Sequence, residues 1–261
     1  MAKDLQKKEQ STAVTLDASM FEADAGVGNE NLTQEDLALP FIKVEPKDGQ
    51  IFNSVTNETY NAKDGIRVIP CIYQRRYIEW SPRGTGSNAP ENIYTPEEWA
   101  DKTISPEVVR NQVDNKDYIK NSQNYIEETC QHFVLVLNEE GFGEPAVIAM
   151  KSTQLKKSRK WNSMVSTRMA TNKEGMPFQM PRFSHVYHLK TVPESNNKGE
   201  WYGWEIALEK QLDDPKLYVQ ARDFAKAVQD GSMVAKHSQD DDPDTKDDDR
   251  DTKTESGEGV F

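Results

Sequence analysis

The residues 66–80, IRVIPCIYQRRYIEW, constrain the fold more than any other stretch of this sequence. They are rich in β-branched and aromatic side chains, which favour a pleated, half-buried strand. Pro70 lies inside the stretch and has no backbone N–H, so it predicts a sheet edge or a β-bulge at that point. The chain is therefore expected to be built around one long strand.

Further strands are predicted downstream, and one helix interrupts them. The strands are expected at 131–138, 145–151, 182–192 and 201–210, with a glycine-containing hairpin between the first two. A helix is predicted over 152–170 with Ser152 as its N-cap, and a last helix begins at Pro215 and stops at Gly231. This order of elements is that of a five-stranded OB barrel. The predicted fold is mainly β with α additions: a five-stranded OB-fold-like barrel with an insertion after the first strand, a C-terminal helix and disordered termini.

The segment 81–128 separates the first two of these strands and is interpreted as the insertion. It opens with the flexible, glycine-containing loop SPRGTGSNAP and continues into TPEEWADK. In the second stretch Thr95 is a predicted N-cap, Pro96 takes the first helical position and Glu98 completes a capping box. A short local helix is expected there.

Acidic charge is concentrated at the two ends of the chain. Residues 1–39 contain 8 acidic and 3 basic residues, and residues 238–261 contain 10 and 3, while residues 40–237 contain 26 of each sign. The net charge of -12 therefore does not argue against an anionic partner for the body. Three regions are predicted: a disordered acidic arm over 1–39, an OB-fold-like single-stranded DNA-binding domain over 40–232, and a disordered acidic tail over 233–261.

Several classes of protein are disfavoured by what the sequence lacks. Two cysteines, Cys71 and Cys130, are too few for a disulfide framework, and there is no run of 18 apolar residues and no signal peptide at the start. We therefore expect a soluble protein of the host cytoplasm, without a membrane partner. Ala149 stands in EPAVIAMK where a restriction-type nuclease needs a metal-binding carboxylate, and neither a phosphate-binding loop nor a nucleophile elbow is present.

The Cys and His residues of the predicted strands do not favour a metal site. Cys130 and His132 would share one strand face, whereas His185 and His188 would point to opposite faces of another strand. We expect no enzymatic activity, no metal and no cofactor.

A basic stretch over 151–190 points to a nucleic acid instead. It contains nine lysines and arginines against one acidic residue, Glu174, and aromatic residues are interleaved with them. Cations that follow phosphates and aromatics that stack on bases are what sequence-independent single-strand binding requires. The candidate DNA-binding residues, which include part of the first strand, are Arg67, Tyr73, Arg75, Tyr77, Trp80, Arg83, Lys151, Lys156, Lys157, Arg159, Lys160, Arg182, His188, Lys190 and Trp201.

Some of these side chains have an alternative interpretation. The cations from Lys156 to Lys160 also fit a merely solvated helix face, and Trp161 lies on the apolar arc of the same helix and is assigned to the core. Along the last strand, Trp204 shares a face with the predicted barrel interior, while Trp201 faces outward. In the fourth strand, Arg182, His188 and Lys190 are expected to face outward.

The chain ends in DDDPDTKDDDRDTKTESGEGVF, and this tail resembles that of bacterial and bacteriophage single-stranded DNA-binding proteins. Their plan is an OB-fold body followed by a flexible acidic tail that ends in an aromatic residue, and the match is best to the phage replication type. The resemblance implies a tail that screens the cationic groove until DNA displaces it, and that then recruits a polymerase, a helicase-primase or an exonuclease. The residues expected to carry this role are Asp247, Asp248, Asp249, Val260 and Phe261.

The leading hypothesis is a protein that coats and protects single-stranded DNA in phage replication or recombination. The main alternative is an acidic protein-interaction factor, such as a DNA mimic or a regulator of host transcription, without affinity for single strands. A virion structural component and a nuclease are further alternatives. A homodimer is compatible with the leading hypothesis, and the sequence does not choose an oligomeric state.

Overall fold

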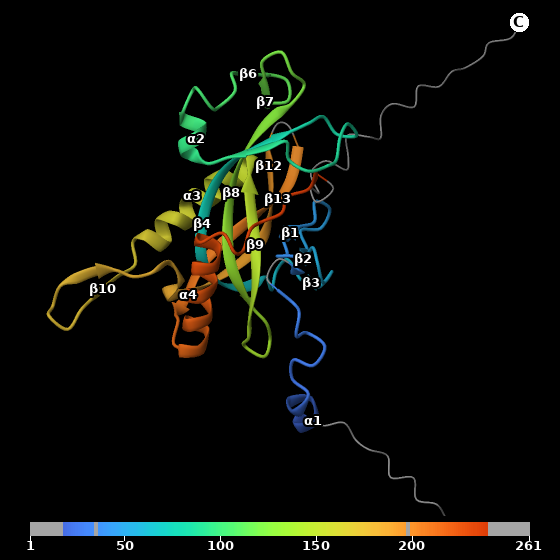
Figure 1. The fold of residues 1–261 in the computed structure, drawn as a ribbon. Coiled ribbons are helices and arrows are strands. Elements are labelled where there is room, and N and C mark those ends of the chain that lie inside the picture. Colours follow the sequence, from blue (N-terminus) through green and yellow to red (C-terminus); the bar gives the residue numbers. More distant parts are fainter. Residues whose placement is uncertain (1–17, 34–35, 197–198, 240–261) are drawn as a thin grey trace, which may run out of the picture. The chain divides into compact units, whose positions relative to one another are not determined.

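The computed structural model describes residues 18–33, 36–196 and 199–239 (Figure 1). The chain divides into two compact units, Met1–Leu37 and Ala38–Phe261. The described part of the first unit contains the short helix α1 (Ala18–Ala23). All the strands and the other helices that the structure describes belong to the second unit. Of the predicted acidic tail, 233–261, the residues from 240 onward lie outside the described residues, and they include Asp247, Asp248, Asp249, Val260 and Phe261.

The second unit is built on one large antiparallel sheet whose central strand is β4 (Ile66–Trp80). β4 pairs with β8 (Tyr125–Leu137) on one side and with β12 (His185–Asn196) on the other. β9 (Gly143–Lys151) continues the sheet beyond β8, and β13 (Gly199–Gln211) continues it beyond β12. The spatial order β12-β4-β8-β9 is that of a Greek key, in which the fourth strand returns to lie beside the first.

The sequence prediction of a mainly β protein with added helices is confirmed. The five long strands follow one another in the predicted order, with the helix α3 (Leu155–Ser166) between the third and the fourth. The pairing of β4 and β8 shifts register between Pro70 and Ile72, so the β-bulge predicted at Pro70 is present. The strands form open antiparallel sheets, and the described residues contain no closed barrel.

A small three-stranded sheet lies at the free edge of β9. It consists of β1 (Ile42–Val44), β2 (Ile51–Asn53) and β3 (Thr59–Tyr60), and Phe41 forms a parallel bridge with Val147 of β9. Its β1–β2 turn reaches β12, where the Thr191 hydroxyl donates a hydrogen bond to the Gly49 carbonyl. Gly49 has φ +73° and lies directly against the Tyr202 ring, so a side chain at this position would clash. The small sheet and its flanking residues therefore contact β9 on one side and the β12–β13 pair on the other.

The segment between β4 and β8 carries β5 (Asn92–Tyr94), α2 (Pro96–Ala100), β6 (Val108–Arg110) and β7 (Asp117–Ile119). The predicted capping box is present, because the Thr95 hydroxyl accepts from the Glu98 N–H and the Glu98 carboxylate accepts from the Thr95 N–H. β8 begins at Tyr125, earlier than predicted, so the insertion ends at residue 124 rather than 128.

The observed helix α3 differs from its prediction at its N-terminal end. Ser152 is not an N-cap: it has φ +48° and opens the 3-10 turn η2 (Ser152–Gln154) ahead of α3. After α3 the chain forms a separate hairpin of β10 (Met169–Thr171) and β11 (Pro177–Gln179), and a second 3-10 turn, η3 (Arg182–Ser184), precedes β12. The last helix, α4 (Pro215–Gln229), has Pro215 at its first position as predicted, with Asp214 as its N-cap.

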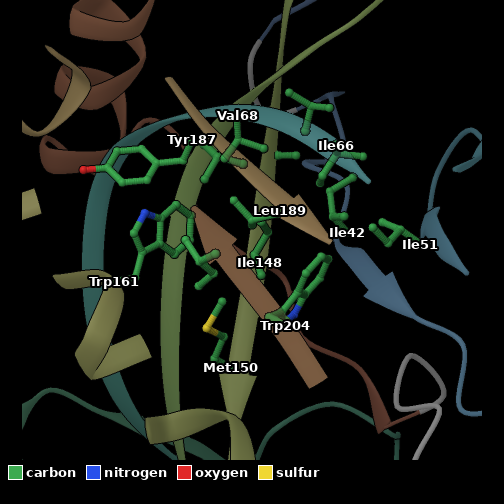
Figure 2. Packing of buried hydrophobic residues seen from close by; sticks show 14 of the residues in the cluster. Ile42, Ile51, Ile66, Val68, Ile148, Met150, Trp161, Tyr187, Leu189 and Trp204 are labelled. Atoms are coloured by element: carbon green, nitrogen blue, oxygen red, sulfur yellow. The ribbon is translucent and has the colours of Figure 1, made fainter. Parts of the chain in front are cut away.

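Apolar side chains cover both faces of the large sheet. One face packs against α3 and the small sheet, and there Trp161 is fully buried beside Tyr187, as its assignment to the core predicted (Figure 2). The opposite face packs against α4 through Phe133 and Phe224, among others. Among the described residues, no helix is long and apolar enough to cross a membrane.

Candidate nucleic-acid interface

A cleft of about 660 Å³ opens at the end of β9, where the large sheet is not closed. Its floor is formed by residues of β8 and β9, and its walls by β1, the insertion, β13 and the segment that follows α4. The main lining residues are Phe41, Lys43, Trp80, Arg83, Lys116, Tyr118, Tyr125, Glu127, Thr129, Ala149, Lys151, Trp201, Tyr202, Trp204, His237 and Gln239.

Most of the charged side chains in the described lining of this cleft are cations. Lys43, Arg83, Lys116 and Lys151 line it together with one carboxylate, that of Glu127. Low-dielectric walls strengthen the attraction of such a group of charges for an anion. The cleft is therefore suited to a phosphate-bearing ligand, although the chain as a whole is acidic.

Aromatic rings stand around the same cleft. Trp201 and Tyr202 are partly exposed at its β13 wall, and Trp204, which also lines the cleft, is buried. The Trp201 indole N–H donates to a Glu194 carboxylate oxygen at 3.0 Å, which fixes the orientation of the ring. At the opposite wall, the Lys116 ammonium lies 4.4 Å from the centre of the Tyr125 ring. Aromatic rings and cations thus line the same cleft.

A second groove of about 670 Å³ adjoins the cleft, between α3 and the β12–β13 pair. It shares Thr153, Trp201 and Trp204 with the cleft, and three lysines of α3 line it: Lys156, Lys157 and Lys160. Lys157 is paired with Glu194, the same carboxylate that holds Trp201. Cleft and groove therefore form one track that passes Trp201.

The chain returns to the cleft after α4. The ring centre of His237 lies 5.0 Å from that of Phe41, and the His237 side chain is hydrogen-bonded to Gln131. Gln239 is buried, its side-chain amide donating to the Ser81 carbonyl at 2.7 Å and its backbone N–H to the Asn88 carbonyl at 2.8 Å. Gln239, the last described residue before the acidic run, therefore lies in the lining of the cleft.

Comparison with known proteins gives one informative match. The family described as "Pam3 phage gp34-like protein" matches residues 45–234, which is well over half of the chain. The chain belongs to this family. The match indicates a bacteriophage protein. No curated protein and no solved structure matches the chain.

In this member of the gp34-like family, seven of the predicted DNA-binding residues line the track. Four are in the cleft and three in the groove: Trp80, Arg83, Lys151, Trp201, Lys156, Lys157 and Lys160. They come from four separate segments of the chain, which the sheet brings together. Arg159 is exposed on α3 but does not line either hollow.

Four of the predicted DNA-binding residues belong to β4 and contact residues outside the track. Arg67 is held by Glu209 at 2.6 Å, and Arg75 lies 3.6 Å from Glu128. The Tyr77 ring stacks on Trp99 of α2 at 4.8 Å, and the Tyr73 hydroxyl contacts the Cys130 sulfur at 3.1 Å. These contacts place all four side chains outside the lining of the track.

The remaining three lie near β12. Arg182 was expected to face outward, but its guanidinium points inward and donates to His132 Nδ1 at 3.0 Å and to Asn162 Oδ1 at 2.8 Å. Its burial lowers its pKa to about 10. A 3-10 turn replaces the predicted strand there, so the alternation that was used to orient Arg182 does not hold. His188 is hydrogen-bonded to the Asp64 carbonyl at 2.6 Å, and His188 and Lys190 are only partly exposed.

Several residues that line the track were not predicted from the sequence. Lys43 and Phe41 come from the short β1 region, Lys116 and Tyr118 from the insertion, and His237 and Gln239 from the segment after α4. The signal for Lys116 was present as a basic residue close to tyrosines, but nothing local indicates that the insertion folds back over β8. Among the described residues, no group of three or more His, Cys, Asp or Glu side chains is placed to hold a metal ion.

Proposed function

We propose that this protein binds single-stranded DNA and coats and protects it during phage DNA replication or recombination. The observation that carries the proposal is the track itself: the cleft and the groove are each lined by cations, and the partly exposed Trp201 lines both. A single strand offers both of the groups that such a track can bind, phosphates and unstacked bases.

The energetics favour a single strand over a duplex. A base that stacks on an aromatic side chain contributes ~1–3 kcal/mol, and this contribution is available only where the base is not already stacked inside a duplex. Phosphate contacts add an attraction that weakens as salt rises. Under this proposal Trp201 supplies the first contribution, and three cations that line the same cleft, Lys43, Arg83 and Lys116, supply the second.

The arrangement of strands also supports an OB-fold-like interpretation. An OB fold is a partly open, five-stranded Greek-key barrel that binds oligonucleotides on its second and third strands and on the loops beside them. In this chain the second and third long strands are β8 and β9, and they form the floor of the cleft. The loop between the first and second strands is the insertion, which forms one of the walls.

The acidic tail also has a role in the proposed function. Residues 238–261 contain 10 acidic residues, and the described part of the chain ends at Gln239 on the cleft rim. A tail of this charge is a local competitor for the cationic track, so weak binding of other anions is suppressed until single-stranded DNA displaces it. Recruitment of replication or recombination enzymes by the tail, which the sequence resemblance implies, forms part of the same proposal.

The test is binding of a fluorescently labelled, mixed-sequence 30-nucleotide strand, measured by anisotropy. The Trp201→Ala variant is expected to raise the dissociation constant by roughly tenfold, since a stacking contact contributes ~1–3 kcal/mol. Trp99→Ala serves as the matched control, because Trp99 is also partly exposed but stacks on Tyr77 away from the track. Equal losses in the two variants would argue against a role for the track.

The alternative of an acidic protein-interaction factor predicts a different result. In that case the wild-type chain would show no affinity for the strand at low salt, and neither tryptophan variant would matter. The same anisotropy experiment therefore decides between the two functions.

A further inference from the structure

The floor of the cleft carries polar groups that a purely electrostatic track does not need. Tyr125, Glu127 and Thr129 follow one another on the same face of β8, and Lys151 lies opposite on β9. The Lys151 ammonium is 3.2 Å from one Glu127 carboxylate oxygen and 3.3 Å from the other. This carboxylate opposes phosphate binding and offsets the charge of Lys151, so these two residues are better suited to a polar ligand group than to a phosphate.

Thr129 gives an independent indication of a ligand. Its side chain is 2% exposed and lines the cleft, and its hydroxyl has no hydrogen-bond partner among the described residues. A buried hydroxyl that has lost water without gaining a partner is unfavourable. A rotation about χ1 of Thr129 would turn this hydroxyl into the cleft, where a polar ligand atom would supply the missing hydrogen bond.

We propose that Glu127, Thr129 and Lys151 form a base-reading subsite, which binds the polar edge of a nucleobase that bears an exocyclic amino group. The inference rests on the proposed function, because it assumes that the ligand is a nucleic acid. It goes beyond that function by making the binding selective among bases: cytosine, adenine and guanine are accepted and thymine is disfavoured.

The selectivity follows from the chemistry of the four bases. An ionised carboxylate only accepts hydrogen bonds, so Glu127, which already accepts from Lys151, can bind a ligand group only where that group is a donor. Cytosine, adenine and guanine each carry an exocyclic NH₂ group, whereas thymine has a carbonyl oxygen, O4, where cytosine has its amino group. In the same position thymine therefore directs a carbonyl oxygen at the carboxylate. Lys151 and the Thr129 hydroxyl can donate to the ring nitrogen or carbonyl beside the amino group.

The test compares two pyrimidine strands of equal length, dC12 and dT12, in competition anisotropy. The two bases have the same ring size and stack weakly, so the comparison isolates the amino-for-carbonyl exchange. The wild-type protein is expected to bind dC12 at least fivefold more tightly than dT12. Equal affinities would overturn the subsite but leave the proposed function in place, whereas no binding of either strand would overturn both.

Three variants connect this preference to the floor residues. Glu127→Gln is expected to reduce the dC12 preference to less than twofold, because an amide can donate to thymine O4 as well as accept from an amino group. Thr129→Val, which keeps the shape of the side chain, is expected to reduce the preference about threefold while the midpoint of thermal unfolding stays the same or rises. Glu128→Gln is the control, since Glu128 is the neighbouring carboxylate and pairs with Arg75 outside the cleft. A preference that persists in both Glu127→Gln and Thr129→Val would contradict the assignment.

Discussion

At the scale of single residues, His132 is a buried polar group that neighbours hold at both ring nitrogens and on the ring face. It is fully buried and stacks on Trp161 at 4.4 Å. Its Nδ1 accepts from Arg182 at 3.0 Å, which assigns the ring proton to Nε2 and makes that nitrogen a donor to the Ser158 hydroxyl at 2.8 Å. Burial first, and the Arg182 charge second, hold the pKa of His132 well below its usual range. The folded protein therefore keeps this imidazole neutral.

This neutral histidine makes stability depend on pH. In the unfolded chain the imidazole takes up a proton below its ordinary pKa of about 6.5, whereas in the folded chain it does not. The contribution to stability is thus fully present above about pH 6.5, and it decreases as the pH falls below that value, by up to about 1.4 kcal/mol per pH unit. Urea unfolding from pH 7.5 to 5.5 should show this slope in the wild type.

The His132→Gln variant should lose most of the slope, whatever its absolute stability. His188→Gln, at a partly exposed position of β12, serves as the control and should keep the slope. An identical pH dependence in wild type and His132→Gln would show that the proton uptake occurs elsewhere.

Predictions for single residues succeeded where the neighbouring sequence determines how a side chain is oriented. They failed where a residue remote in sequence determines its environment. The outward orientation of Trp201 followed from strand alternation, and the structure places it in the lining of the cleft. Tyr77 and Arg75 lie on an equally regular strand, but their environment is set by Trp99 and Glu128, which are remote in sequence. Strand alternation predicts on which face of the sheet a side chain lies. It does not predict which other residues cover that face.

At the scale of elements, the stability of the α4 helix is expected to depend on the N-cap of its first turn. The Asp214 carboxylate accepts from the Lys216 and Leu217 N–H groups, and the helix packs onto the sheet through Phe224 and Val228. Removal of an N-cap costs about 1 kcal/mol. Asp214→Ala is therefore expected to lower the free energy of unfolding by about that amount in urea titration.

The control for this prediction is Asp223→Ala, an exposed position in the middle of the same helix, where Asp223 pairs with Arg222. Such a surface pair contributes little, so the change should be well under 1 kcal/mol. If the two variants were equally destabilised, capping would not explain the effect of Asp214→Ala.

Element prediction was best for the long strands and for local capping. The capping box at Thr95 and the proline at the start of α4 depend on neighbouring residues alone, and both are present. Ser152 has the right residue type for an N-cap, but its φ of +48° lies outside the extended region that a cap requires. The strands of the small sheet have only two or three residues each, so their pattern is too short to predict a wall of the cleft.

At the scale of the whole molecule, charge is separated by region. The acidic residues that give the chain its net charge of -12 are concentrated before residue 40 and after residue 237, while the described cleft carries four cations and one carboxylate in its lining. The neutral body predicted from the sequence thus contains a locally positive track. Its position was not predictable, because it is assembled from β1, β8, β9, β13 and the insertion, which meet only in the folded sheet.

The measurement that tests the account most directly is the affinity for a mixed-sequence single strand across a salt series, for the full chain and for a chain ending at Gln239. We expect both to bind, the shortened chain more tightly, with the logarithm of affinity falling with the logarithm of salt at a slope of about −3 to −5, since roughly −0.7 is expected per contacted phosphate. Absence of binding by both chains at low salt would contradict the central claim that the track is a single-stranded DNA site.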